Sequence, residues 1–259
     1  MKKLSYIVTL SLSLFVIPSV QAAEFVQFVS CPVYRDTQNG RKSGCWLADN
    51  PETGIRYDVT QSASKPDWNY AVLVEGLTAE GDEQLCGGQV LEPVKTSILF
   101  GESCPAHMLP AEGFEGRFFT LPPRTVAPLA VPRRDLEGPF EDKTFHLFFD
   151  YNQDFIIYQY TDFLLDQAIT WIRAAQPQHF TITGFADTER RTISGRVLSE
   201  RPGIAQDRAE MIKEALLRVG IREDQINLEF NTNPQPVDVE GADGILSASR
   251  RRVDIRAEF

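Results

Sequence analysis

The sequence has few histidines and, beyond its first residues, no long hydrophobic run. The three histidines, His107, His146 and His179, are far apart, which argues against a zinc enzyme or a histidine-based relay. No later segment is apolar over the roughly 20 residues needed to span a bilayer. Basic residues are not in excess, because the net charge is −10, so we expect no general attraction to nucleic acid.

The composition is that of an ordinary globular protein, with 42% hydrophobic and 24% charged residues. The length of 259 residues fits two domains, at roughly 100–200 residues each. A proline-rich stretch, residues 121–139, separates a β-like block from a block in which strands and helices alternate. We interpret this stretch as a semi-extended linker.

Residues 1–22 have the features of a secretory signal peptide. Lys2 and Lys3 precede an apolar segment at residues 6–17, and residues 20–22 place small side chains at a cleavage site. A transmembrane anchor is the alternative, but the segment is shorter than the roughly 20 residues that a span requires. We expect cleavage, no lipid anchor and no transmembrane segment in the mature chain.

All cysteines lie in the first half of the chain, at Cys31, Cys45, Cys86 and Cys104. Because we expect the protein to lie outside the cytoplasm, we expect these cysteines to form two disulfides. Three pairings are possible. We favour Cys31–Cys45 and Cys86–Cys104 because local closures are simpler. The spacings do not resemble zinc knuckles, so a metal site is the lesser alternative, and we expect no metal and no cofactor.

Residues 23–120 contain short strand-like runs separated by Gly, Asn, Asp and Pro, which predicts a small β-rich domain with two disulfides. Trp46, Trp68 and Tyr70 are candidates for a binding surface, with burial in the core as the alternative. No catalytic spacing is visible in this block.

Residues 140–259 alternate strand and helix patterns. Phe145, Leu147 and Phe149 occupy alternate positions of a strand, and Thr161 is the expected cap of the helix that follows. Further strands are expected at residues 179–184, 226–230 and 253–257, with a second helix that ends at Gly220. The order βαβαββ predicts a mixed-sheet α/β sandwich, and the whole chain is therefore expected to be α+β.

Arg208 is the anomaly in the second helix. It precedes Ile212 by four residues, so it projects from the helix's buried face. It also lies near the helix N-terminus, where the macrodipole disfavours a cation by ~0.3–1 kcal/mol. We expect Arg208 to have a partner. Snorkelling to solvent, or a salt bridge to Asp207 or Glu210, is the alternative.

Two turns and a basic segment supply further candidates. Asp187 follows a strand that ends in Gly184, whose small size allows a ligand to approach, with an Asx-turn as the alternative. Asn152 lies in the loop after the first strand and is otherwise an ordinary loop residue. Arg251 and Arg252 must point to opposite faces of the last strand, so one of them is a candidate to face a pocket.

Four ordered segments around these residues resemble the OmpA-like peptidoglycan-binding domain, which also occurs in peptidoglycan-associated lipoproteins and flagellar stator proteins. The segments are residues 148–152, 182–188, 204–212 and 249–255. The resemblance covers about half of the chain, and we do not recognise the N-terminal half. It implies non-covalent binding of a peptidoglycan stem peptide, often through meso-diaminopimelate, whose free end carries an ammonium beside a carboxylate.

The resemblance also implies a role for each candidate residue. Asp187 would bind the ammonium and Arg208 the carboxylate, while Asn152 would supply neutral hydrogen bonds and Arg251 would reinforce the anion side. Arg201 is a rival for the role of Arg208. The sequence departs from the family in three places: Phe185 and Ala186 stand before the aspartate, residues 189–203 form a longer stretch than usual, and Arg250 replaces an asparagine.

The resulting prediction is a non-enzymatic protein of the periplasm, associated with the cell wall and the outer membrane, that presents its N-terminal domain to an envelope protein partner. The alternative is a structural component of an envelope or flagellar motor complex, because the layout resembles that of the flagellar protein MotY. An enzyme is not expected, since Glu200, Asp207 and Glu210 are candidates only through their acidity.

Overall fold

The computed structural model describes residues 23–38, 44–80, 83–117, 136–156 and 159–259. The predicted signal peptide and most of the predicted linker lie outside the described residues. We call residues 23–117 the N-terminal domain and residues 136–259 the C-terminal domain. Within the described part of the chain, no helix combines the length and the apolar character that crossing a membrane requires.

The N-terminal domain is built on a seven-stranded sheet with the order β1-β5-β6-β4-β3-β2-β7. Strand β6 joins its two halves, because it pairs antiparallel with β5 and, at its start, parallel with β4. A short helix, α1 (Glu83–Cys86), precedes β6. The strands are β1 (Phe25–Ser30), β2 (Pro32–Arg35), β3 (Cys45–Asp49), β4 (Arg56–Asp58), β5 (Tyr70–Thr78), β6 (Gln89–Ser103) and β7 (Met108–Leu109).

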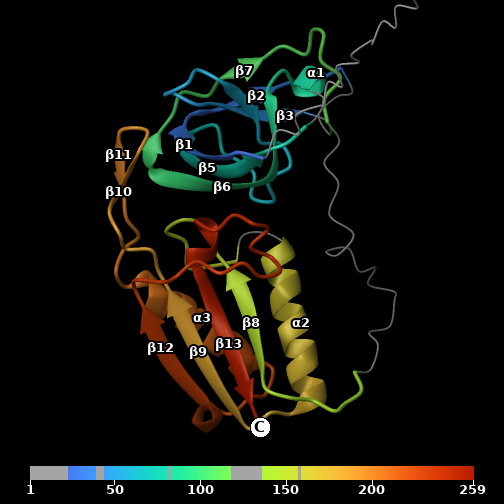
Figure 1. Cartoon of the computed structure of the whole chain (residues 1–259), viewed down its shortest axis with the longest axis vertical. Coiled ribbons are helices and arrows are strands. Elements are labelled where there is room, and N and C mark those ends of the chain that lie inside the picture. Colours follow the sequence, from blue (N-terminus) through green and yellow to red (C-terminus); the bar gives the residue numbers. More distant parts are fainter. Residues whose placement is uncertain (1–22, 39–43, 81–82, 118–135, 157–158) are drawn as a thin grey trace, which may run out of the picture.

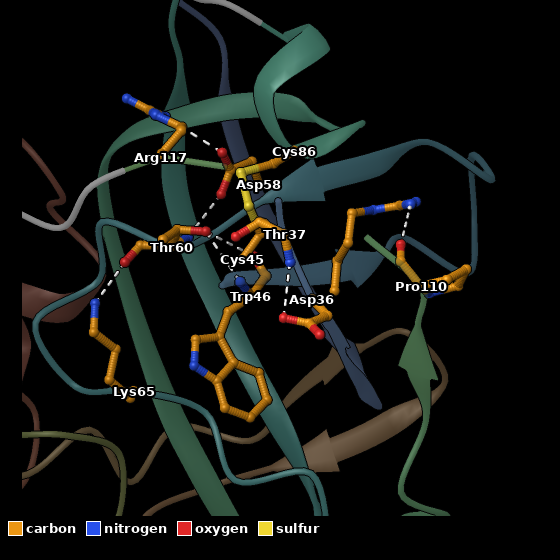
Figure 2. Close-up of a disulfide and its surroundings, with 11 residues drawn as sticks. Asp36, Thr37, Cys45, Trp46, Asp58, Thr60, Lys65, Cys86, Pro110 and Arg117 are labelled. Carbon is orange, nitrogen blue, oxygen red and sulfur yellow. Dashed lines mark hydrogen bonds and ion pairs between the residues drawn. A yellow bond between two sulfur atoms is a disulfide. The ribbon is translucent and has the colours of Figure 1, made fainter. Parts of the chain in front are cut away.

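All four cysteines form disulfides, but the favoured pairing was wrong. The bonds are Cys31–Cys104 and Cys45–Cys86. Strand pairing explains the first bond, because β1 and β6 lie on either side of β5, so the residues that follow them meet at one end of the sheet. Figure 2 shows the second bond beside Asp58. The tertiary arrangement therefore overrides the local closures that sequence distance favours.

The aromatic candidates of the N-terminal domain divide between two ring clusters. Trp46 and Trp68 lie with Tyr34, with ring centroids 5.2–5.9 Å apart. Tyr70 instead packs against Phe100 at 5.3 Å. Trp68 is exposed and Trp46 is partly buried, so the predicted three-residue surface does not form as one unit.

The C-terminal domain has a four-stranded sheet with the order β12-β9-β13-β8. Side chains from both long helices and from β8, β9 and β13 form one apolar core, so both helices cover the same face of the sheet. The predicted βαβαββ order is present, with an inserted hairpin. The elements are β8 (Lys143–Phe148), α2 (Gln159–Ala175), β9 (His179–Phe185), β10 (Arg191–Ile193), β11 (Arg196–Leu198), α3 (Ile204–Arg218), β12 (Ile226–Asn231) and β13 (Arg252–Glu258), with short 3₁₀ turns η2 (Glu223–Gln225) and η3 (Ala248–Arg250).

Two local predictions differ from the structure. Helix α2 begins before Thr161, whose hydroxyl donates to the carbonyl of Phe148 at 3.0 Å and so ties the helix to β8. Gly184 is small for a different reason than predicted: a Cβ there would lie 1.9 Å from the carbonyl oxygen of Ala205 in α3. The space at Gly184 is therefore filled by a helix backbone and not by a ligand.

The N-terminal domain contacts the end of the C-terminal sheet that carries the loops after β8 and before β13 (Figure 1). The Ser64 hydroxyl donates to the Asp150 carboxylate at 2.6 Å, and Lys95 donates to the carbonyl of Gly241 at 3.0 Å. The hairpin of β10 and β11 extends from the C-terminal domain along the side of the N-terminal sheet (Figure 1). The predicted site residues therefore lie where the two domains meet.

Candidate functional site

Arg208 lies in the first half of α3 with no exposed surface. Its guanidinium sits 5.2 Å from the ring centre of Phe149. Three of its donors bind backbone carbonyls, those of Gln153 at 2.7 Å, Phe185 at 2.8 Å and Asp150 at 3.1 Å. These three hydrogen bonds fix the orientation of the buried guanidinium. Its two remaining N–H groups, one on Nη1 and one on Nη2, therefore point at one place.

That place is occupied by the carboxylate of Glu200. Arg208 donates to its two oxygens, from Nη2 to Oε1 at 2.6 Å and from Nη1 to Oε2 at 3.1 Å. All five N–H groups of Arg208 are thereby satisfied. The Glu200 side chain has no exposed surface either, so this is a buried, two-point ion pair.

Two backbone N–H groups complete the environment of the same carboxylate. Asn152 donates to Oε1 and Asp187 donates to Oε2, each at 2.8 Å. Asn152 adopts a positive φ of 54°, and its side-chain oxygen accepts from the backbone N–H of Arg201 at 3.0 Å. Three of the four predicted residues thus converge on one carboxylate, two of them through backbone groups.

The Asp187 carboxylate lies beside this cluster and is paired with a cation from its own chain. Nη1 of Arg191 lies 3.1 Å from its Oδ2. Burial of the group raises the pKa of Asp187, and the nearby Arg191 opposes that rise. Asp187 is therefore oriented by the hairpin instead of being open to solvent.

Arg251, the fourth predicted residue, faces the N-terminal domain. Its guanidinium forms a buried ion pair with Glu75 of β5, through both carboxylate oxygens. The carboxylate of Glu75 also accepts from the Ser247 hydroxyl at 2.6 Å and from the Gln27 amide at 2.9 Å. Arg251 lies in a different cluster from Arg208, and its partner comes from the other domain.

Of the neighbouring arginines, Arg252 differs from the predicted arrangement and Arg201 does not. Arg252 does point away from Arg251, but it is buried, with its guanidinium 3.9 Å from the ring centre of Phe185. Arg201, the rival of Arg208, lies on the surface, where it pairs with Asp154 and Asp207. The arginine surrounded by the predicted residues is Arg208.

A small pocket lies between Asp187, Arg251 and the hairpin, with Leu73 and Gln27 of the N-terminal domain on its other wall. The space open to solvent molecules inside it is about 20 Å³, which is room for roughly one water. In the described ranges, no three His, Cys, Asp or Glu side chains come close enough to hold a metal ion.

Sequence reasoning missed the two acids that pair with the predicted arginines. In the sequence Glu200 is a candidate only through its acidity, and Glu75 is not among the candidates. Both are fully or almost fully buried. Glu75 does interrupt the apolar run of β5, which is a weak sign of a buried partner, while nothing around Glu200 in the sequence distinguishes it from a surface acid.

No protein-family model matches the sequence, and no curated protein matches it significantly. Solved structures match part of the chain at low identity. The peptidoglycan-associated lipoprotein from Burkholderia pseudomallei is 24% identical over 43% of this chain and 87% of its own, with a TM-score of 0.32. The cell wall anchor of the T6SS from Pseudomonas aeruginosa is 17% identical over 47% and 85%, with a TM-score of 0.34.

The periplasmic domain of MotB from Helicobacter pylori is a third such structure, 16% identical over 47% of this chain and 86% of its own, with a TM-score of 0.34. Similarity at this level does not establish a family. The assignment of function therefore rests on the residues that surround Arg208.

Proposed function

We propose that this protein is a periplasmic, non-catalytic binding protein whose C-terminal domain recognises a carboxylate of a peptidoglycan stem peptide. One observation carries the proposal: Arg208 and the N–H groups of Asn152 and Asp187 all converge on a single carboxylate. Charge-assisted hydrogen bonds of this kind contribute about 1.5–3 kcal/mol each to the binding of a carboxylate. The site is thus chemically suited to the anion that the sequence resemblance implies.

The Asp187 side chain supports a zwitterionic ligand over a simple anion. Its backbone N–H reaches the carboxylate position, while its own carboxylate lies beside the same site and pairs with a cation, Arg191. A ligand with an ammonium next to its carboxylate, such as the free end of diaminopimelate, would replace Arg191 at Asp187 and Glu200 at Arg208. Two opposite charges at a fixed separation provide the specificity.

A structural role in an envelope assembly is the second candidate, and one observation favours it. Both predicted ligand arginines, Arg208 and Arg251, are neutralised by acids of the same chain. In this alternative the N-terminal domain binds a protein partner, and the two charge pairs are only structural: Arg208–Glu200 within the C-terminal domain and Arg251–Glu75 between the two domains. Recovery of partners from extracts that are free of peptidoglycan would favour it.

Co-sedimentation of the mature protein with purified sacculi tests the wall-binding proposal. We expect wild-type protein to pellet and Asp187→Asn to bind at least about tenfold more weakly, because one charge-assisted bond is lost. Asp224→Asn is the matched control, since Asp224 is an exposed acid on the far 3₁₀ turn. Equal pelleting of wild type and Asp187→Asn would contradict the site. Because we propose no enzymatic activity, we expect that incubation of the protein with sacculi releases no soluble fragments.

A further inference from the structure

We propose that Glu200 is an internal ligand of the Arg208 site and that the N-terminal domain holds it there, so that the site opens only when hairpin β10–β11 leaves the N-terminal sheet. The inference rests on the proposed function for the identity of the external ligand, a wall carboxylate. Glu200 has the chemistry that such a ligand would have, and it makes every bond that the site offers to a carboxylate.

Glu200 is the last residue of a loop that starts at Asp187. The backbone N–H of Glu200 donates to the carbonyl of Asp187 at 3.0 Å and closes the base of this loop. Between them lie β10 and β11, joined by Ser194 and Gly195 with φ values of 50° and 73°, as in a two-residue hairpin turn. A displacement of the hairpin is therefore transmitted directly to the residue that fills the site.

The tip of the hairpin is bound to the N-terminal domain. The backbone N–H of Val29 in β1 donates to the Ser194 hydroxyl at 3.1 Å, and Arg196 forms an ion pair with Glu102 at the end of β6. Ile193 and Leu198 pack in an apolar cluster with residues of β1, β5 and β6. These contacts join the loop that carries Glu200 to three strands of the other domain.

The opposite wall of the site is bound to the same domain. The loop after β8 supplies the N–H of Asn152, and the backbone N–H of its neighbour Tyr151 donates to the Ser97 hydroxyl of β6 at 2.9 Å. The Tyr151 hydroxyl in turn accepts from the N–H of Ser199 at 2.8 Å. Docking of the N-terminal domain thus fixes both walls of the carboxylate site around Glu200.

An internal ligand lowers the apparent affinity for an external one in proportion to the fraction of molecules that are open. If one molecule in ten or fewer is open, removal of Glu200 strengthens binding at least about tenfold. A protein partner that displaces the hairpin from the N-terminal domain would have the same effect. Binding of the partner and binding of the wall would then be coupled.

The experiment compares sacculus binding of the full mature chain and four variants. We expect Glu200→Ala to bind at least about tenfold more tightly than wild type. Arg196→Glu leaves the site intact and repels Glu102, so we expect a gain of at least about threefold. Arg190→Glu is the matched control, because Arg190 is exposed on the same loop and has no ion pair within the described residues. The variant Asp187→Asn reports separately on wall binding.

Acetate provides a second measurement that does not depend on the wall. In Glu200→Ala, acetate has a vacant place at Arg208, so it should raise the melting temperature of this variant and leave wild type unchanged. Formation of a site that takes an added carboxylate is the direct sign that Glu200 is a ligand and not only a structural acid.

Each outcome decides between the two proposals. Tighter pelleting of Glu200→Ala and Arg196→Glu, with Arg190→Glu like wild type, supports the inference. Equal pelleting of all proteins except Asp187→Asn overturns it and leaves wall binding intact. A gain in Glu200→Ala without one in Arg196→Glu overturns control by the hairpin. If acetate stabilises Glu200→Ala and no protein pellets, Glu200 is an internal ligand and the proposed wall ligand is wrong.

Discussion

Arg208 and Glu200 form an ion pair from which solvent is excluded, and neither residue lies in the same secondary-structure element as the other. Arg208 is in α3, while Glu200 lies in the short connection between β11 and α3. The pair joins the start of the helix to the loops after β8 and β9, because the same groups bind Asp150, Gln153 and Phe185. It is therefore a central element of the C-terminal domain as well as a candidate binding site.

Loss of one member of this pair should destabilise the protein strongly. We expect Arg208→Met to lower the free energy of unfolding by about 3–5 kcal/mol, because Glu200 is left as a buried, unpaired charge. The double variant Arg208→Met/Glu200→Leu should recover part of this loss, since no charge remains buried. Urea unfolding of both single variants and the double variant gives the coupling energy. A cost below about 1 kcal/mol for Arg208→Met would contradict the buried pair.

Gly184 should not tolerate even a methyl group. A Cβ at this position would lie 1.9 Å from the carbonyl oxygen of Ala205, so Gly184→Ala must move α3 away from β9. We expect a loss of about 1–3 kcal/mol, as for other overpacked cores. Gly101→Ala in β6 is the control, because nothing lies within 4 Å of the added atom. Thermal unfolding of the two variants checks the difference.

Glu75 should govern the docking of the two domains. Its pKa is lowered because Arg251 and its hydrogen-bond donors outweigh the effect of burial. Glu75→Gln leaves Arg251 charged and poorly paired, so we expect the domain interface to loosen. Hydrogen exchange should become faster around residues 150–152 and 245–251, while β9 stays protected. Glu92→Gln, at an exposed acid in β6, should leave exchange unchanged in both segments.

The domain interface should also respond to pH through Asp150. Burial raises the pKa of Asp150 to about 6, although Ser64 and the nearby Arg251 and Lys95 favour the charged form. This pKa is higher in the folded state than in the unfolded state. Folding at a pH between roughly 4 and 6 is therefore accompanied by uptake of a proton at Asp150. The stability that protonation contributes is complete below about pH 4 and is lost as the pH rises through 6.

We therefore expect wild type to gain up to about 3 kcal/mol, relative to Asp150→Asn, between pH 7.5 and pH 4. Asp150→Asn removes the titrating group and can keep an acceptor for the Ser64 hydroxyl. Unfolding curves at a series of pH values measure the difference. A parallel pH dependence of the two proteins would show that Asp150 is not the group responsible.

The disulfides should each stabilise the N-terminal domain by constraining the unfolded chain. The bonds span 73 residues for Cys31–Cys104 and 41 residues for Cys45–Cys86, so removal of either one should cost about 4 kcal/mol on the chain-entropy model. Peptide mapping without reduction checks the pairing directly, and unfolding of the paired Cys→Ser variants checks the magnitude. Fragments that link Cys31 to Cys45 would contradict the structure.

The sequence alone predicted the four sheet strands and two long helices of the C-terminal domain, though not hairpin β10–β11, and it showed the unusual position of Arg208. Alternation of apolar residues along strands and their helical spacing in α2 and α3 are local patterns, so they survive without knowledge of the fold. The position of Arg208 on the buried face of α3 led to the prediction that it has a partner, with snorkelling or a surface salt bridge as the alternative. Prolines and a change in composition also indicated the two-part layout of the chain.

Only the tertiary structure decided which groups are paired. The disulfide partners are brought together by sheet order, and the Glu75 carboxylate at Arg251 by domain docking. Glu200 is only eight residues from Arg208, but it is held at the guanidinium by contacts with loops that are distant in the sequence, such as the N–H of Asn152. The space at Gly184 was ambiguous for the same reason, since a small residue is equally compatible with a ligand and with a helix backbone. Contacts between distant segments depend on the whole fold, because each charge is placed by a different element.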